Sequence, residues 1–251
     1  MMKNSLLYDD VVIRKNRLPR NSNYFEIIDS RDKAYWLGIM YSDGCVCKRK
    51  EGKYSISLEM VDKEHIEKFK NALSSAHKIC TIRHKGYENA KLSYSIHIYD
   101  NKIANDLINL GCIPRKSTCL SSIPDIPQEF IYDFIRGYVD GDGCIYYKKT
   151  DDYYSFSLAG ASPLFLKNIM KILEIDKLSL NKLTETSYQI ISVKRDDIYR
   201  ILTRLYEHST EATRLDRKYN KYIEFIQWHE QKNNKMGKKE NEYANIFKTI
   251  E

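Results

Sequence analysis

Two aspartates, Asp43 and Asp142, lie near the ends of two similar runs, WLGIMYSDGC at 36–45 and IRGYVDGDGC at 135–144. Each run is typical of an apolar helix stopped by Asp-Gly, because glycine accepts the left-handed backbone found just beyond a helix. A carboxylate at a helix C-terminus meets the negative end of the helix dipole, and two carboxylates in one place repel each other. If the two acids come together, they need a compensating positive charge.

A divalent cation with oxygen ligands supplies that charge. Mg²⁺ binds one or two carboxylates together with substrate phosphate oxygens, and carbonyls at helix ends can complete its shell. Metal ions flanking a phosphodiester can activate water and stabilise both the attacking and the leaving oxygen. Asp43 and Asp142 therefore predict a site for Mg²⁺, or another divalent cation, that hydrolyses a phosphodiester.

The elements that position these acids are also repeated. The run YSISL at 54–58 recurs as YSFSL at 154–158, and the run that ends at 98–99 before a helix is answered by one that ends at 193–194. Similar blocks in the same order, with small changes of offset, indicate a duplicated unit of roughly 80 to 100 residues.

Small residues suggest how the two motif helices meet. Gly38 and Ser42 in the first motif, and Gly137 and Gly141 in the second, are four residues apart and share one helix face. Such seams allow two helix backbones to approach closely. We therefore expect the two helices to pack around a pseudo-twofold axis, which brings Asp43 and Asp142 together.

Hydrophobic periodicity predicts the order αββαββα in each half. In the first half we expect a helix at about 33–43, strands on either side of a tip at 51–53, a helix with Asp62 as its N-cap, strands near 78–84 and 91–99, and a helix at about 101–110. We divide the chain into an N-terminal basic extension (1–32), a first half (33–112), a linker (113–128), a second half (129–207) and a C-terminal extension (208–251). That extension is predicted to hold one apolar-faced helix and a flexible polar run at 231–239.

Composition is consistent with a soluble intracellular protein that binds nucleic acid. The 251 residues include 41 basic and 34 acidic side chains, for a net charge of +7. Basic residues cluster at 14–20 and in predicted hairpin tips and strand ends at 48–53, 83–91 and 148–149, as expected for a nucleic-acid interface. The sequence contains no apolar stretch near the roughly 18 residues that a membrane span needs, and we expect no membrane partner.

The paired motifs and the αββαββα order resemble the LAGLIDADG homing endonucleases, in their single-chain form with two motifs, over about residues 33–207. The resemblance implies an α+β fold in which duplicated αββαββα units form a pseudo-twofold saddle of two antiparallel four-stranded sheets. It also implies a monomer that binds a long double-stranded DNA site in the major groove and cuts both strands with a divalent metal.

The resemblance assigns roles to individual residues. The family's metal-binding acid corresponds to Asp43 and Asp142, while Tyr41 stands where an earlier aspartate is common and Asp140 keeps it in the second copy. A polar position near the metal corresponds to Asp62 and Ser162. The family's basic residue near the scissile phosphate is assigned to Lys194, with Tyr99 in the matching place of the first half.

Strand alternation predicts the residues that face DNA. If Val46 and Ile145 face the core, the neighbouring positions face the groove, where Arg49 and Lys148 could contact bases or phosphates and serines could donate or accept hydrogen bonds. The predicted DNA-facing residues are Cys47, Arg49, Glu51, Ser55, Ser57, Tyr146, Lys148, Thr150, Ser155 and Ser157.

Two other functions are compatible with this fold. An intron maturase would bind intron RNA, and nothing in the sequence excludes it. A DNA-binding regulator without cleavage is less consistent with the chain, because both aspartates are retained.

Overall fold

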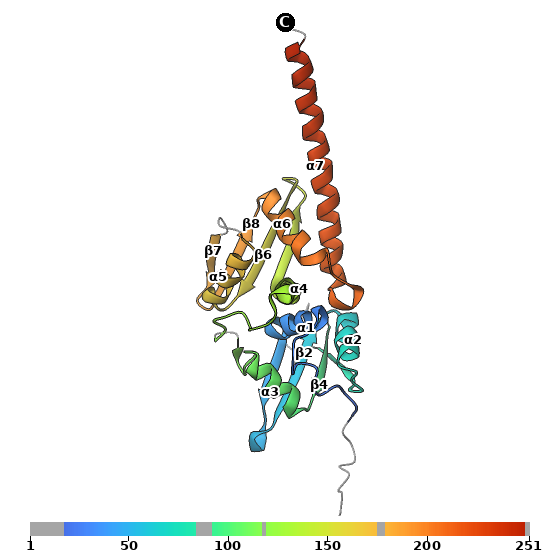
Figure 1. Cartoon of the computed structure of the whole chain (residues 1–251), viewed down its shortest axis with the longest axis vertical. Coiled ribbons are helices and arrows are strands. Elements are labelled where there is room, and N and C mark those ends of the chain that lie inside the picture. Colours follow the sequence, from blue (N-terminus) through green and yellow to red (C-terminus); the bar gives the residue numbers. More distant parts are fainter. Residues whose placement is uncertain (1–17, 84–91, 117–118, 175–178, 249–251) are drawn as a thin grey trace, which may run out of the picture.

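The computed structural model describes residues 18–83, 92–116, 119–174 and 179–248. Within them the two halves lie one after the other along the long axis of the molecule, with one helix of each half between them (Figure 1). The basic residues predicted to form clusters at 14–17 and 84–91 lie outside the described residues.

Both halves have the predicted order αββαββα. The first half comprises α1 (Arg31–Ser42), β1 (Gly44–Lys48), β2 (Tyr54–Met60), α2 (Lys63–Ala72), β3 (Ile79–Ile82), β4 (Ser93–Ile98) and α3 (Asn101–Asn109). The second half comprises α4 (Ile131–Asp142), β5 (Gly143–Lys148), β6 (Tyr153–Gly160), α5 (Pro163–Ile172), β7 (Ser179–Thr184), β8 (Ser187–Ser192) and α6 (Arg195–Tyr206). Short 3₁₀ helices occur at η1 (Lys50–Gly52), η3 (Gln128–Phe130) and η4 (Glu211–Thr213).

Each half forms one antiparallel four-stranded sheet. The strand orders are β1-β2-β4-β3 and β5-β6-β8-β7, so the two sheets have the same topology. The predicted α+β fold with duplicated units is therefore confirmed. In both sheets the first strand runs outward from the motif helix, the second returns, and the last strand runs outward again beside the second.

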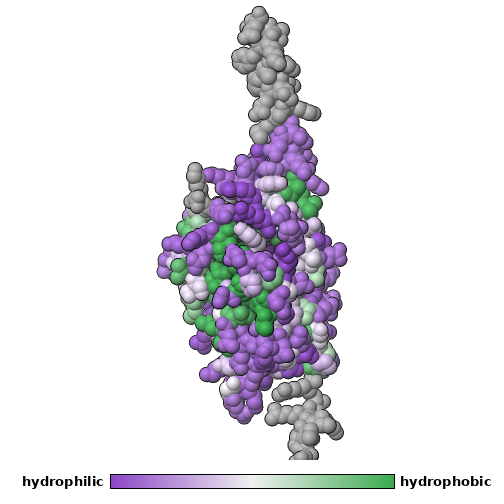
Figure 2. All heavy atoms as spheres, in the orientation of Figure 1, coloured by the Kyte–Doolittle hydropathy of each residue, from purple (hydrophilic) through white to green (hydrophobic). Residues whose placement is uncertain are grey.

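One face of each sheet is covered by helices and forms the core. Val46 and Ile145 are 2% and 7% exposed, as the alternation predicts, and they pack with buried residues of β2, β4, β6 and β8. The other face, which we call the open face, carries the alternate positions of each strand. Figure 2 shows apolar residues toward the middle of the side of the molecule seen there and hydrophilic residues around them.

The helices α1 and α4 pack along the predicted seam of small residues. A Cβ added to Gly38 would lie 2.1 Å from the carbonyl oxygen of Phe134, and one added to Gly137 would lie 2.1 Å from that of Tyr35. The two backbones therefore touch directly, and neither glycine leaves room for a side chain. This contact joins the two halves.

The C-terminal extension differs from its prediction. Helix α7 (Asp216–Lys248) begins beside the first half, where Lys68 Nζ lies 2.7 Å from Asp216 Oδ2. It then packs Phe225 and Trp228 against Tyr154 of the second half and continues beyond that half (Figure 1). The polar run at 231–239, predicted to be flexible, is part of this helix. None of the described helices is both long and apolar enough to cross a bilayer.

Candidate active site

Asp43 and Asp142 lie at the C-terminal ends of the two packed helices. Asp43 is the residue that caps α1, and Asp142 is the last residue of α4. A Cβ added to Gly141 would lie 2.0 Å from Ser42 Oγ and 2.6 Å from Asp43 Oδ2, so the Asp43 carboxylate rests against the backbone of the other helix. The structure thus brings together the two acids that the sequence predicted as a pair.

The environment of the two acids opposes their ionisation. Burial, followed by repulsion from Asp142, raises the pKa of Asp43 to about 6. The pKa of Asp142 is also raised, again mainly by burial, although the hydroxyl of Tyr138 donates a hydrogen bond to it and lowers the pKa in part. Asp142 keeps an exposed surface, so the site is open to solvent on its side. Two carboxylates held in this way favour a cation between them.

A buried lysine from the C-terminal extension supports the end of α4. Lys218 is 4% exposed, and its Nζ donates to the carbonyl oxygens of Val139, Asp140 and Gly141 at 2.7, 2.6 and 3.2 Å. Burial lowers the pKa of this lysine to about 8, and the neighbouring aspartates act in the opposite direction. Its positive charge lies where the helix dipole and the acids concentrate negative charge.

A second buried lysine, from the linker, lies at the end of α1. Lys116 is 7% exposed, and its Nζ donates to the carbonyl oxygen of Gly44, the residue after Asp43. Its charge lowers the pKa of both Asp43 and Asp142. One lysine thus follows the last helix of each half and donates to the backbone at the motif of that half.

Neither lysine was predicted from the sequence. The repeat is visible in blocks at nearly constant offsets, but the stretch between the last helix and the lysine is five residues longer in the second half (207–217) than in the first (110–115). A search for one basic residue after each last helix could have found them.

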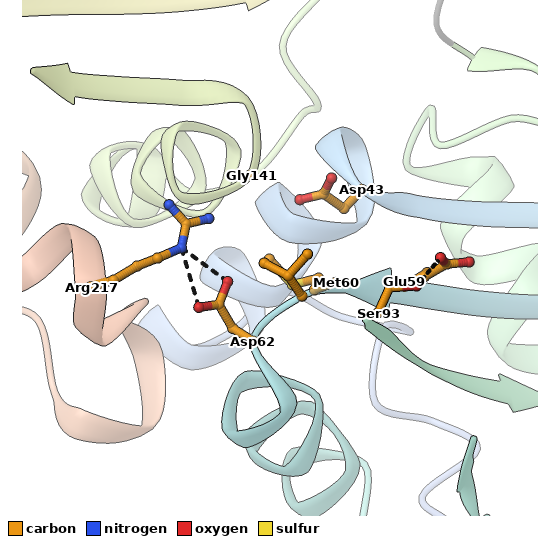
Figure 3. A pocket seen from close by; sticks show the side chains of 8 residues that line it. Asp43, Glu59, Met60, Asp62, Ser93, Gly141 and Arg217 are labelled. Atoms are coloured by element: carbon orange, nitrogen blue, oxygen red, sulfur yellow. Dashed lines mark hydrogen bonds and ion pairs between the residues drawn. The ribbon is translucent and has the colours of Figure 1, made fainter. Parts of the chain in front are cut away.

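Arg217 borders a pocket next to Asp43. The pocket has a volume of about 370 Å³, and its lining includes Asp43, Asp62, Gly141 and Arg217. Arg217 Nε lies 3.0 and 3.2 Å from the two carboxylate oxygens of Asp62 (Figure 3). Figure 3 shows the terminal nitrogens of Arg217 turned away from Asp62. The start of α7 therefore brings a cation to a pocket that is lined by both halves and lies beside Asp43.

Asp62 and Ser162 both precede the second helix of their half, but their side chains make different contacts. Asp62 precedes α2 at the predicted N-cap position, but its side chain pairs with Arg217 and does not cap the helix. Ser162 does cap its helix, since its Oγ accepts a hydrogen bond from the Phe165 N–H at 3.2 Å. Asp62 lines the pocket beside Asp43, whereas Ser162 is 8% exposed and is engaged in helix capping.

Lys194 does not lie beside the two acids. Its strand β8 pairs with β6 so that Ser192 is opposite Phe156, whereas Gly143, next to Asp142, is opposite Leu158. Lys194 follows Ser192 by two residues and lies roughly 13 Å farther out along the sheet than Gly143, at about 3.3 Å per residue. The prediction that Lys194 lies close to Asp43 and Asp142 is wrong for this reason, and Lys116 and Lys218 are the lysines that contact the backbone beside these acids.

The earlier aspartate of the motif has a structural role in the second half. Asp140 is fully buried and accepts hydrogen bonds from the hydroxyls of Tyr35 and Tyr206, at 2.7 and 2.5 Å, and from the Leu215 N–H at 2.8 Å. In the first half, the hydroxyl of Tyr41 donates to the carbonyl oxygen of Leu110. Each of the two side chains connects its helix to the chain at or after the last helix of that half. Tyr41 thus replaces the usual aspartate with a different packing contact.

Most of the predicted DNA-facing residues lie on or beside the open faces. Cys47 is opposite Ser55, and Tyr146 is opposite Ser155, so each pair shares a face. Ser57 and Ser157 occupy the next positions inward on the same faces. The strands end at Lys48 and Lys148, so Glu51 and Thr150 lie in the hairpin turns, where strand alternation does not fix their direction, whereas Arg49 is still extended and its N–H donates to the carbonyl oxygen of Lys53.

The two acids fit a divalent cation. Both offer carboxylate oxygens, which Mg²⁺ and Ca²⁺ prefer, and burial raises the pKa of both groups, so a bound cation would favour their ionised form. In the part of the chain that the structure describes, no cluster of three or more histidines, cysteines or acids could hold a metal. The predicted use of helix-end carbonyls is not supported at α4, because Lys218 already binds those of residues 139–141.

Comparison with known proteins agrees with this architecture. Residues 30–109 match a family model described as a LAGLIDADG-like domain. Over 115 residues the chain is 30% identical to the DNA-directed RNA polymerase subunit Rpo1C of Methanocaldococcus jannaschii, aligning 45% of this chain with 12% of that protein. It is 24% identical over 155 residues to an uncharacterized protein of the same organism, aligning 58% of this chain with 54% of that one. The chain therefore spans less than two thirds of both relatives.

Solved structures extend the likeness to both halves. The meganuclease I-SmaMI bound to uncleavable DNA superposes with a TM-score of 0.52 and 12% sequence identity, covering 80% of this chain and 91% of that one. The same LAGLIDADG homing endonuclease bound to cleaved DNA gives a TM-score of 0.51. The first half of the chain thus carries a LAGLIDADG-like domain, and the chain as a whole has the single-chain, two-motif fold of the LAGLIDADG homing endonucleases.

Proposed function

We propose that this protein is a site-specific DNA endonuclease that makes double-strand breaks at a long target by metal-dependent phosphodiester hydrolysis. The observation that carries the proposal is the meeting of Asp43 and Asp142 at the ends of two helices in backbone contact, between two sheets with open faces. The similarity to I-SmaMI, which was crystallised with DNA, supports DNA as the substrate.

Asp43 and Asp142 would hold the metal, and phosphate and water oxygens would complete its ligands. When bound, Mg²⁺ or another divalent cation supplies an activated water and neutralises charge on the phosphodiester. The protein's own part is to fix the two carboxylates: the seam of α1 and α4 sets their separation, while Lys116 and Lys218 hold the backbone beside them. This leaves the acids poised for a cation and a DNA phosphate.

Arg217 is suited to bind a phosphate next to this site. Its Nε is held by Asp62, so the guanidinium is oriented, and its terminal nitrogens remain available as donors on the pocket side. An oriented guanidinium binds phosphate oxygens well because its N–H groups form a planar fork. Asp62 thereby acts as a positioning residue for Arg217.

DNA would lie along the open faces of the two sheets, engaged by polar and basic side chains such as Lys148. We expect log K for binding to fall linearly with log salt concentration, with a slope of about −0.9 for each phosphate neutralised. The check is a titration of fluorescent DNA with protein at several salt concentrations. An affinity that does not depend on salt would contradict contact between the open faces and the phosphates of the DNA backbone.

The function is tested by selection from a randomised duplex library. The protein is incubated with the library in Mg²⁺, and the ends of the cut molecules are sequenced. We expect breaks in both strands at one long sequence and none when a chelator replaces Mg²⁺. If the protein binds DNA but does not cut it in any divalent cation, it is a DNA-binding regulator. If it promotes splicing of an intron RNA and does not cleave DNA, it is a maturase.

Lys218→Met should impair the site without removing an acid. The carbonyls of residues 139–141 would lose their donor, and the acids would lose a compensating charge, so we expect cleavage to fall by about 10- to 100-fold and unfolding free energy by about 1 to 3 kcal/mol. Single-turnover cleavage and urea unfolding measure the two effects. Lys221→Met is the matched control, because Lys221 is on the same helix and pairs with Glu224 at the surface. Wild-type cleavage by Lys218→Met would show that this lysine does not support the acids.

A further inference from the structure

A basic hollow lies at the outer end of the first sheet, far from the two acids. It has a volume of about 440 Å³ and is formed by three segments: the chain before α1, the β1–β2 hairpin and the junction of β4 and α3. Its charged and aromatic lining includes Arg20, Arg49, Lys53, Lys102, Asp100 and Tyr99.

The charges of this lining are unequally compensated. Arg20 Nε lies 2.5 Å from Asp100 Oδ2, which also accepts from Ser22, so that pair is close to neutral. Lys53 pairs with Glu51 at 2.5 Å, and Lys102 pairs with Asp106 at 2.9 Å. Arg49 has no ion pair among the residues that the structure describes, so its charge is available for an outside anion.

Arg49 is held in a fixed orientation. Its guanidinium lies over the ring of Tyr99, with the carbon Cζ 4.3 Å from the ring centroid. Stacking of this kind fixes the plane of the guanidinium and leaves the N–H groups at its edge free, which suits two parallel hydrogen bonds to a phosphate. The Arg49 N–H donates to the carbonyl oxygen of Lys53 at 2.7 Å, so these two residues continue the β1–β2 pairing beyond Cys47 and Ser55. The hollow therefore continues the open face.

At the equivalent end of the second sheet, Lys148 stands in the place of Arg49 and is paired instead. Lys148 Nζ lies 2.5 Å from Asp151. Asp152 accepts hydrogen bonds from the Tyr147 hydroxyl at 2.8 Å and from Trp228 Nε1 at 2.7 Å, and it pairs with Lys232 of α7. The two ends of the molecule thus offer different surfaces to a long ligand.

We propose that the hollow around Arg49 is a phosphate-binding pocket that holds the DNA backbone at the outer end of the first half-site. The inference rests on the proposed function and gives it a direction, because it anchors one end of the target more strongly than the other. It also gives the chain before α1 a role, since Arg20 and Ser22 fix Asp100 and form one wall of the pocket.

The test compares Arg49→Ala with Lys63→Ala on the selected DNA target. Lys63 carries the same charge but pairs with Glu67 on α2, outside the hollow. For Arg49→Ala we expect weaker binding by about 3- to 30-fold, equally at the target and at sites with single base changes, and a salt slope smaller by about 0.9. Lys63→Ala should change the affinity and the salt slope by no more than about a third of the change expected for Arg49→Ala. Ethylation of backbone phosphates should locate the lost contact at one end of the footprint.

The outcomes separate this inference from the proposed function. If Arg49→Ala keeps the wild-type salt slope and relaxes preference at one base pair, Arg49 reads a base and the pocket assignment is wrong. If the wild-type protein binds DNA with the expected Arg49 effect but never cuts it, the pocket stands and the endonuclease proposal fails. If the wild-type protein binds no DNA, both are overturned.

Discussion

Asp43→Asn is expected to reduce DNA cleavage by roughly 10³-fold or more and, at the same time, to stabilise the folded protein. Cleavage should fall because the amide is a poor metal ligand, whereas DNA binding should change little because the proposed DNA contacts lie on the sheets. Stability rises because the wild-type carboxylate is ionised at pH 7 in a place that disfavours its charge. Asp142→Asn should have the same effect on cleavage.

The sign of the stability change follows from the pKa of Asp43. The folded-state value of about 6 lies above the ordinary 3.8, so the folded protein binds the proton more tightly than the unfolded chain. Ionisation of Asp43 therefore lowers the free energy of unfolding. This loss is absent at low pH, grows as pH rises from about 4 to 6, and is complete above that range. We expect Asp43→Asn to add about 1 to 3 kcal/mol of unfolding free energy at pH 7 and almost nothing at pH 4.

Urea unfolding at the two pH values measures this effect, with Asp125→Asn as a control at an exposed position. Thermal unfolding with and without Mg²⁺ adds a reading that does not depend on activity, because a cation bound to the folded site should raise the wild-type melting temperature more than that of the variant. A variant less stable than the wild type at pH 7 would show that the acids are compensated without a metal.

Gly38→Ala and Gly137→Ala are expected to have the largest effects on stability. Each added Cβ would lie 2.1 Å from a backbone oxygen of the other helix, so the helices must separate and the two halves lose their contact. We expect a loss of about 3 kcal/mol or more, at the upper end of overpacking, together with loss of cleavage as the acids move apart.

Gly52→Ala is the matched control for these two variants. Gly52 has a φ of +67° and nothing within 4 Å of an added Cβ, so its substitution carries only backbone strain, about 1 kcal/mol. Urea unfolding of the three variants gives the comparison. If Gly38→Ala costs no more than Gly52→Ala, the helices do not pack through this seam.

Local pattern predicted the motif helices, their seam and the paired acids because all three depend on residues close in sequence or on the repeat. The small residues four positions apart fix where α1 and α4 touch, and the Asp-Gly ends fix where the acids lie. The same repeat gave the αββαββα order. These features needed no knowledge of how the strands pair.

The basic residues of the site could not be found in this way. Their position depends on strand order: the last strand of each half lies beside the second and runs outward, so Tyr99 and Lys194 lie at the outer ends of the sheets. The following helix returns the chain to the axis, which is why Lys116 and Lys218 reach the backbone carbonyls beside the acids. Arg217 and Lys218 also belong to an extension outside the repeat, where the alignment of halves carries no information.

The central claim, that Asp43 and Asp142 form one metal-dependent site for cutting DNA, is tested most directly by single-turnover cleavage of the selected target with each strand labelled separately. We expect the wild-type protein to cut both strands in Mg²⁺ and neither strand in chelator, and the Asp43→Asn, Asp142→Asn double variant to bind the target with nearly wild-type affinity but cut neither strand. Cleavage of either strand by the double variant at the wild-type rate would contradict the claim.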